Sequence, residues 1–244
     1  MYNPLISVVI PVWNRPDFLK ASVASVLNQS YENFELIIVD DGSTDETIST
    51  AIDLVDKDSR VNLILKRHSG ATATFNRGVE EVKGDYFCLL GSDDLWHPEK
   101  LQRQVEVSEM FPEHVIHTES LRIDGDGNPQ KDVYRSTLKD ELGDCTPKAF
   151  YDRHASKPYA AFFGSSIFVP VKALEVAGPF PDTMCQDYHW VIIACLIHHI
   201  RFTLIPEHLI QNRTNPRSTT SENYKFILKE SIEVWESVKA EAGI

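Results

Sequence analysis

The stretch that indicates the fold is Tyr86-Phe87-Cys88-Leu89-Leu90-Gly91-Ser92-Asp93-Asp94-Leu95-Trp96, an apolar run that leads directly into two adjacent carboxylates. Apolar runs of this length, bounded by glycine, are typical of strands buried on both faces of a sheet. Charges at the end of a buried strand cost free energy unless a cation, a ligand or water meets them. Because ligands of open α/β sheets bind beyond the carboxyl ends of the strands, we expect a ligand site at Asp93 and Asp94.

The chain on the N-terminal side of this stretch alternates between strand-like and helix-like segments. Apolar, β-branched runs predict strands over residues 5–12, 34–39, 61–65 and 86–90. Helical spacing and first-turn residues predict helices that begin near Pro16, Ser43, Ala71 and Pro98. Such alternation predicts an α/β fold, a doubly wound and mostly parallel sheet with right-handed crossovers, flanked by helices.

The pattern changes after Pro112. Strands are predicted over residues 115–123, 165–169 and 201–205, and helices over residues 171–177, 186–198 and 222–242. Residues 124–128 resemble a calcium loop at first, but Pro129 and Arg135 replace its glycine and its final acid, so a hairpin turn is expected. We expect residues 113–244 to form a smaller α+β half of one compact domain, beside a half formed by residues 1–112.

Composition excludes several classes of protein. The 244 residues are 42% hydrophobic and 25% charged, as in globular domains, and the net charge of −12 argues against binding nucleic acid. The N-terminus is unlike a signal peptide, and the apolar stretch 191–197 is too short for a membrane span. The four cysteines lack metal-type spacing, which is typical of reduced thiols. We expect a cytoplasmic protein, and peripheral attachment to the inner face of the membrane stays open.

Two pairs of carboxylates follow two predicted strands. Asp40 and Asp41 close the second strand as Asp93 and Asp94 close the fourth, and the ends of parallel strands share one edge of the sheet. Successive side chains of an extended segment point in opposite directions. We therefore expect a divided site, in which one carboxylate of the later pair meets a nucleotide and the other a cation. Mg²⁺ or Mn²⁺ typically takes one or two carboxylates together with substrate phosphates.

Three motifs in this half carry a family resemblance. Ile10-Pro11-Val12-Trp13-Asn14, Val39-Asp40-Asp41-Gly42-Ser43-Thr44-Asp45 and Gly91-Ser92-Asp93-Asp94-Leu95-Trp96 resemble the family 2 glycosyltransferases of the GT-A fold. The resemblance is dense from residue 5 to about 105 and weaker to about 220. It implies a GT-A fold and an inverting enzyme that uses a nucleotide-diphospho-sugar. It also implies that residues 1–112 bind the donor and that residues 113–244 bind the acceptor and supply the catalytic base.

The resemblance also implies roles for single residues. The nucleotide would lie against Pro11, Val12, Trp13, Asp40, His68 and Asp93. Asp40 would accept the imide N–H of a uracil or similar base, because a carboxylate is an acceptor. Asp94 would hold the divalent ion, Mn²⁺ or Mg²⁺, that bridges the diphosphate.

The second half offers one candidate catalytic residue. Asp187, which follows Gln186, matches the general base that deprotonates the acceptor hydroxyl in inverting transfer. The alternative for Asp187 is that it caps the following helix, and both roles are compatible. Trp190 could stack on a sugar or belong to the core. Arg213 or Arg217 could neutralise the diphosphate or lie on a plain surface loop.

The sequence therefore favours an inverting glycosyltransferase that moves a sugar, with UDP as the favoured nucleotide, to a hydroxyl of a saccharide or lipid-linked acceptor. Phe75, Gly91 and Gln186 depart from the family pattern. These departures keep open a catalytically silent protein that binds nucleotide-sugars or acts as a scaffold. A nucleotidyltransferase is a weaker alternative, because it would need a glycine-rich basic loop after the first strand.

Overall fold

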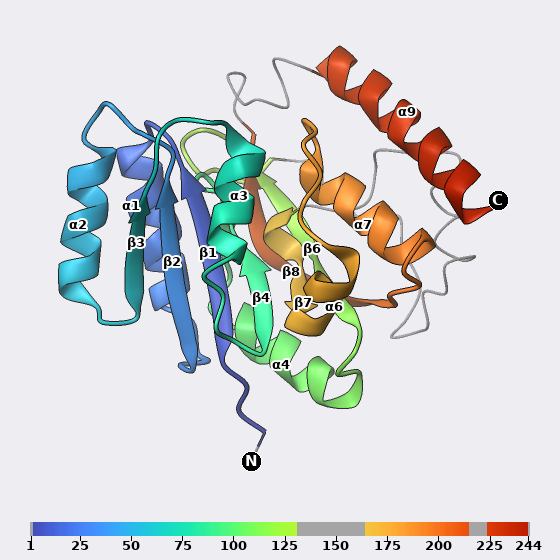
Figure 1. Ribbon diagram of the computed structural model, residues 1–244. Helices are drawn as coiled ribbons and strands as arrows, with labels where there is room; N and C mark the ends of the chain where they lie inside the picture. Colours follow the sequence, from blue (N-terminus) through green and yellow to red (C-terminus); the bar gives the residue numbers. More distant parts are fainter. Residues whose placement is uncertain (1, 131–163, 215–223, 244) are drawn as a thin grey trace.

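The computed structural model describes residues 2–130, 164–214 and 224–243 (Figure 1). Its strands are β1 (Ile6–Val12), β2 (Phe34–Asp40), β3 (Val61–Leu65), β4 (Tyr86–Leu89), β5 (Leu95–Trp96), β6 (Val115–Ile123), β7 (Phe168–Pro170) and β8 (Phe202–Arg213). Its helices are α1 (Pro16–Leu27), α2 (Thr47–Lys57), α3 (Ala71–Val79), α4 (Lys100–Met110), α6 (Val171–Ala177), α7 (Gln186–Leu196) and α9 (Tyr224–Ala242), and η1 (Gly164–Ser166) is a short 3₁₀ helix.

The described strands form one sheet in the order β3-β2-β1-β4-β7-β6-β8-β5. β1, β2, β3 and β4 pair in parallel, as do β6 and β8, whereas β7 and β5 run antiparallel to their neighbours. The predicted α/β architecture with a mostly parallel sheet is therefore confirmed. Both halves of the chain contribute strands to this sheet, and their division into a donor half and an acceptor half stays a prediction.

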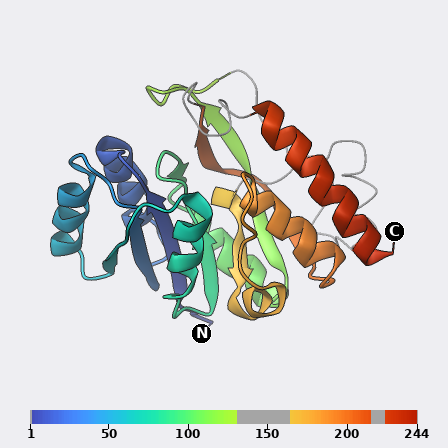
Figure 2. The ribbon, with the colours of Figure 1, turned by 45° about the horizontal axis from the view of Figure 1, so that its top comes forward.

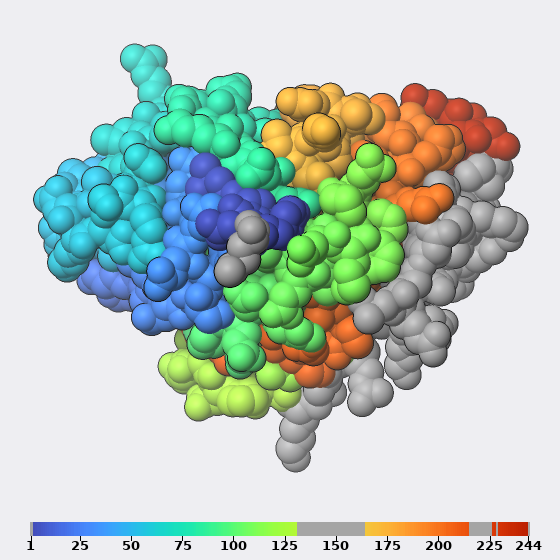
Figure 3. Space-filling model, turned by 90° about the horizontal axis from the view of Figure 1, so that it is seen from below, coloured from blue at the N-terminus to red at the C-terminus, as the bar shows by residue number. Residues whose placement is uncertain are grey.

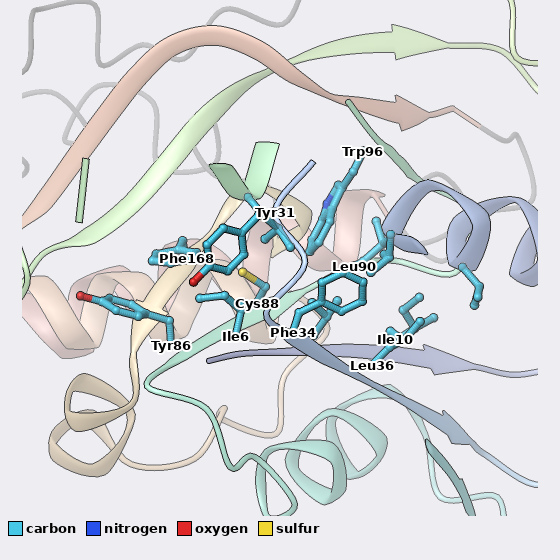
Figure 4. Packing of buried hydrophobic residues seen from close by; sticks show 14 of the residues in the cluster. Ile6, Ile10, Tyr31, Phe34, Leu36, Tyr86, Cys88, Leu90, Trp96 and Phe168 are labelled. Atoms are coloured by element: carbon cyan, nitrogen blue, oxygen red, sulfur yellow. The ribbon is translucent and has the colours of Figure 1, made fainter. Parts of the chain in front are cut away.

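Two apolar layers cover the faces of the sheet, as expected for strands buried on both sides. On one face, Ile6, Val8 and Ile10 of β1 pack with α1 and α4. Figure 4 shows part of this layer, in which Cys88 and Trp96 lie among aromatic and aliphatic side chains. On the other face, alternate strand residues pack beneath α3, α6, α7 and α9 (Figure 1). Alternation along each strand therefore decides which layer a residue joins.

Close packing of α3 on the sheet requires a glycine. A Cβ atom at Gly78 would lie 2.4 Å from Cγ1 of Val9, in β1. Its absence lets α3 approach the strands, which brings the N-terminal end of α3 to the carboxyl edge of β1 and β2.

The second half differs from its predicted elements in two places. The predicted strand 165–169 begins with η1, and only Phe168–Pro170 pairs in the sheet. The predicted strand 201–205 continues as β8 to Arg213, because the register against β6 shifts near Glu119 and accommodates Pro206. Figure 2 shows α9 lying along α7, which closes this end of the molecule.

Several smaller predictions concern the surface and the cysteines. Asp124 accepts the backbone N–H groups of Asp126 and Asn128, so the predicted hairpin turn is confirmed. Cys88, Cys185 and Cys195 are buried thiols outside any disulfide bond, and Cys145 lies outside the described residues. No helix of the described segments has the length and apolarity that a bilayer span needs. Figure 3 shows the N-terminal residues lying against the green segment that includes α4.

The pH dependence of stability is expected to reflect His189 in α7. His189 is fully buried, within hydrogen-bonding distance of Thr183 and Ser231, and burial lowers its pKa to about 4. Between pH 6.5 and 4 the unfolded chain therefore binds a proton that the folded chain does not, and stability falls as pH falls. Urea unfolding should show that the free energy of unfolding decreases between pH 7 and pH 4.5 by about 2–3 kcal/mol more in wild type than in His189→Gln. An equal decrease in the free energy of unfolding of both proteins would contradict the assignment of this pH dependence to His189.

Candidate active site

A cavity of about 700 Å³ opens at the carboxyl edge of the sheet. Because β1 lies between β2 and β4 in the parallel part of the sheet, the residues that follow these three strands meet there. Loop residues before α7 and the start of α9 form the far wall. The wall consists of Pro11, Val12, Trp13, Arg15, Asp41, His68, Ser69, Gly70, Ala71, Thr72, Thr74, Phe75, Gly91, Ser92, Asp93, Asp182, Thr183, Met184, Gln186, Phe226 and Glu230.

One wall of the cavity carries a pair of stacked rings. The rings of Trp13 and His68 lie 4.5 Å apart between centroids, with 25° between their planes. Trp13 remains 48% exposed although it is a large aromatic side chain. A flat and accessible aromatic surface of this kind suits a planar ligand such as a nucleobase. Pro11, Val12, Trp13 and His68, which the family resemblance implies as nucleotide contacts, thus lie together in the cavity wall.

Asp40 and Asp41 point to different layers. Asp40 is fully buried on the α1 face of β2, where its Oδ1 accepts the Ser43 N–H at 2.8 Å. Asp41 lies on the α3 face and lines the cavity. The alternation of side chains along β2 explains this division, since Asp41 still donates its N–H to Val12 O as the next strand residue would. Asp41, and not Asp40, therefore meets the cavity, contrary to the expectation from the sequence.

The carboxylate of Asp41 is held ionised. Burial opposes its charge, but an ion pair with Lys66 and N–H groups from Ser69 and Gly70, both at 3.0 Å, outweigh burial and lower the pKa of Asp41. His68 Nδ1 lies 2.9 Å from the same carboxylate. Asp41 is therefore an acceptor-only group whose two oxygens these donors already surround, so a ligand N–H would replace one of them.

Asp93 and Asp94 lie on a turn and not on an extended segment. The N–H of Asp94 donates to Gly91 O at 3.1 Å, so the expected alternation of side chains does not apply. Asp93 lines the cavity and pairs with Arg15 at 2.5 Å. Asp94 is buried behind it and accepts hydrogen bonds from Ser165 Oγ at 2.5 Å and from the Arg213 N–H at 3.0 Å.

Asp187 lies behind the same edge. It belongs to the first turn of α7, and its oxygens accept the N–H groups of Gly164 at 2.8 Å and Tyr188 at 2.9 Å. Burial raises the pKa of Asp187, and the hydrogen bonds only partly offset this effect. A carboxylate with a raised pKa is a stronger base than an ordinary aspartate, which suits proton abstraction near neutral pH. Its neighbour Gln186 forms part of the cavity wall.

Comparison with known proteins identifies the family. Residues 7–168 match the sequence profile of Glycosyl transferase family 2. The chain belongs to this family. An uncharacterized glycosyltransferase of Haemophilus influenzae is 40% identical over 145 residues, 58% of this chain and 57% of that protein. The Escherichia coli UDP-Glc:alpha-D-GlcNAc-diphosphoundecaprenol beta-1,3-glucosyltransferase WfgD is 31% identical over 146 residues, 57% of each chain. This family 2 chain thus spans little more than half the length of these relatives.

Solved structures of low sequence identity show the same GT-A fold. Staphylococcus aureus TarS 1–349 in complex with UDP-GlcNAc has a TM-score of 0.69 at 16% identity, covering 94% of this chain and 66% of that one. The mannosyltransferase PcManGT of Pyrobaculum calidifontis, in complex with GDP-Man and Mn²⁺, has a TM-score of 0.67 at 18% identity, covering 92% and 61%. The predicted GT-A fold is confirmed.

The carboxylates of this family 2 chain leave a space that fits a cation. A side chain at Gly91 would place its Cβ 3.1 Å from Asp94 Oδ2 and 3.4 Å from Asp93 Oδ1, so both carboxylates border the space above this glycine. Burial and then the charge of Asp93 raise the pKa of Asp94 to about 7, which indicates surplus negative charge. The described residues hold no cluster of three or more acidic, His or Cys side chains that could bind a metal ion. A hard divalent ion bound there would complete its ligands with substrate oxygens and water.

Three of the weaker predictions have different outcomes. Trp190 is fully buried, donates to Gly178 O at 3.0 Å and packs on Phe180, so it belongs to the core. The Arg213 guanidinium donates to the backbone oxygens of Asp93, Asp124 and Gly125, because β8 extends far enough to place it between these loops. Arg213 therefore fastens the loop of Asp93 and does not face the cavity. Arg217 lies outside the described residues.

Sequence reasoning missed several residues of the site. Arg15 lines the cavity and supplies a cation beside Asp93. Its position shortly after β1, at the same edge of the sheet, could have indicated this role. Ser165, which holds Asp94, gave no signal, because its pairing depends on contacts between distant segments. The far wall also includes Phe226 and Glu230 of α9, and Glu230 accepts the Met184 N–H at 2.8 Å.

Proposed function

We propose that this family 2 chain transfers a sugar from a nucleotide-diphosphate donor to a hydroxyl group, with inversion at the anomeric carbon. The observation that carries the proposal is one edge of the sheet where the stacked rings of Trp13 and His68 and the carboxylate of Asp93 line a cavity, with Asp94 and the half-buried Asp187 behind its wall. We further propose a UDP-sugar donor and a lipid-linked saccharide acceptor, the substrates that the name of WfgD gives for that protein.

The nucleotide is proposed to bind at the end of the cavity that holds Trp13. A base stacked on the Trp13–His68 pair would present its N–H edge to Asp41, which remains ionised and can only accept. Uracil and guanine both carry a ring N–H, whereas cytosine does not. Arg15 supplies a cation beside Asp93 for the diphosphate.

The reaction is proposed to occur between the acidic pair and Asp187. Asp93 and Asp94 would hold a Mn²⁺ or Mg²⁺ ion, which when bound supplies Lewis-acid stabilisation of the leaving nucleoside diphosphate. Asp187 would take the proton of the acceptor hydroxyl as the acceptor oxygen attacks the anomeric carbon and the bond from that carbon to the nucleoside diphosphate breaks. The backbone N–H groups of Gly164 and Tyr188 orient the Asp187 carboxylate for this transfer.

Titration with UDP tests the nucleotide site. Trp13→Ala is expected to weaken UDP binding about tenfold or more, because base–aromatic stacking contributes about 1–3 kcal/mol. Trp13 is half-exposed, so its removal should leave folding intact. Met110→Ala, at an exposed residue of α4 outside the cavity wall, is the matched control and should bind as wild type.

Turnover tests the activity. Release of nucleoside diphosphate from UDP-glucose, UDP-GlcNAc and GDP-mannose is measured with a GlcNAc-diphospholipid acceptor and Mn²⁺. The proposal expects acceptor-dependent release from at least one UDP-sugar. Tight UDP binding without turnover of any donor would favour the silent binding protein. Release of pyrophosphate from UTP and a sugar 1-phosphate, supplied in a separate assay, would favour a nucleotidyltransferase.

A further inference from the structure

The 3₁₀ turn η1 connects the two carboxylates to which the proposed reaction assigns different roles. The N–H of Gly164 donates to Asp187 Oδ2 at 2.8 Å. The hydroxyl of Ser165, the next residue, donates to Asp94 Oδ2 at 2.5 Å and accepts the Gly91 N–H at 3.0 Å. Consecutive residues of one short turn therefore hold Asp94 and Asp187.

The turn lies in direct contact with Asp187. A Cβ atom at Gly164 would lie 2.9 Å from Asp187 Oδ2 and 2.9 Å from Leu89 Cδ2, so this position has no room for a side chain. A displacement of η1 would move Asp187 and the partner of Asp94 together. The position of η1 relative to the sheet thus sets the distance between the two carboxylates.

Two buried side chains hold η1 from the core side. The indole N–H of Trp96 donates to Ser165 O at 3.0 Å, and the amide group of Gln104 donates to Ser166 O at 2.9 Å. Trp96 is 4% exposed and Gln104 is fully buried. These bonds fix two consecutive carbonyl groups of the turn, and both donors come from the segment that follows Asp94 in sequence.

Lys100 explains why the amide of Gln104 has this orientation. Its ammonium group is fully buried, donates to Gln104 Oε1 at 2.7 Å and lies 3.9 Å from the centroid of the Trp96 ring. An ammonium group can only donate, so the oxygen of Gln104 must face Lys100 and the NH₂ group must face Ser166. Among the described residues no carboxylate pairs with Lys100, and burial lowers its pKa to about 8. A buried charge without an ionic partner lowers the free energy of unfolding, so stabilisation of the fold does not explain a lysine at this position.

We propose that Lys100 and Gln104 are positioning residues, which fix η1 and thereby the placement of Asp94 relative to Asp187. The inference rests on the proposed function for the roles of these carboxylates. Neither positioning residue lines the cavity, so they act only through the turn. The proposed chain of contacts runs from Lys100 to Gln104, to Ser166, and through Ser165 and Gly164 to the two carboxylates.

Two substitutions separate positioning from stability. Lys100→Met removes a buried charge at similar volume, so Tm is expected to stay equal or rise, while the amide of Gln104 becomes free to rotate. Gln104→Glu keeps an acceptor for Lys100 and supplies an ion pair, but places an oxygen opposite Ser166 O. Lys57→Met, at an exposed residue of α2, is the control and should change none of the measurements.

The measurements are Tm, UDP affinity without metal, Mn²⁺ affinity in the presence of UDP, and kcat. For both variants we expect kcat to fall about tenfold to a hundredfold, since small misplacements of reacting groups have effects of this size. Mn²⁺ affinity should fall severalfold, whereas UDP affinity without metal should stay within twofold, because the aromatic platform is not attached to η1.

Mn²⁺ affinity and kcat within twofold of wild type in both variants would overturn the inference. Loss of metal-free UDP binding together with a lower Tm would also overturn it, since that pattern indicates general destabilisation. If Lys100→Met does not fold, Gln104→Glu decides alone. If wild type binds Mn²⁺ and UDP but turns over no donor, the proposed function fails, and the Mn²⁺ affinities still test whether η1 positions Asp94.

Discussion

Asp187→Asn is expected to lower kcat by roughly 10²–10⁴, the range that a general base typically contributes. Asparagine has the shape of aspartate and can still accept one of the two N–H groups that hold the side chain, from Gly164 or Tyr188. It cannot take a proton from the acceptor hydroxyl at neutral pH. Affinity for UDP should stay within about twofold, because Asp187 lies outside the cavity wall that carries the stacked rings.

The pH profile supplies an independent readout of the same residue. Burial raises the pKa of Asp187, so the base becomes protonated at a higher pH than an ordinary aspartate. We expect kcat/KM of wild type to fall as pH decreases through this raised pKa, and Asp187→Asn to lack that limb. Asp17→Asn, at an exposed carboxylate of α1, is the control. Unchanged turnover in Asp187→Asn would contradict the role of base and leave Asp187 as a structural carboxylate of the first turn of α7, which holds Gly164; the N-cap of this helix is Cys185.

Asp94→Asn is expected to have the second large effect. The variant should lose the part of UDP binding that depends on Mn²⁺, and kcat should fall about 100-fold or more, because metal stabilisation of the leaving group is lost. EDTA should reduce wild-type kcat by a similar factor and should have little further effect on the variant. A variant that retains Mn²⁺-dependent UDP binding would show that Asp93 alone suffices.

Stability distinguishes this loss from misfolding. Asp94 is buried beside Asp93, so a neutral amide removes repulsion between two neighbouring carboxylates. In the presence of EDTA, the free energy of unfolding of Asp94→Asn should therefore equal or exceed that of wild type. A clear decrease would mean that the hydrogen bond from Ser165 matters more than the charge.

The first half of the fold was predictable because its physical signals are local. β1, β2 and β4 are apolar runs of strand length, and a polar residue or glycine follows each within two residues. The second half depends on contacts between distant segments. β8 was predicted too short because Pro206 interrupts the apolar pattern, and only its pairing with β6 shows how a register shift accommodates the proline.

The site was predictable as an edge of the sheet but not in its details. Alternation along β2 places Asp40 and Asp41 on opposite faces, but only the packing of Ile37 and Val39 beneath α3 shows that Asp41 lies on the side of the cavity. The turn from Gly91 to Asp94 and the contact of Ser165 with Asp94 could not be predicted, because they depend on where η1 packs. The raised pKa of Asp187 likewise follows from burial, which the sequence does not show.

The most direct test of the central claim is the anomeric configuration of the product. The chain is incubated with Mn²⁺, an α-linked UDP-sugar that it turns over and a lipid-linked saccharide acceptor, and the new linkage is read by proton NMR. A single carboxylate acting as base on the acceptor predicts a β-linked product, formed at a rate that depends on Asp187. An α-linked product, or turnover of the same size in Asp187→Asn, would contradict the account.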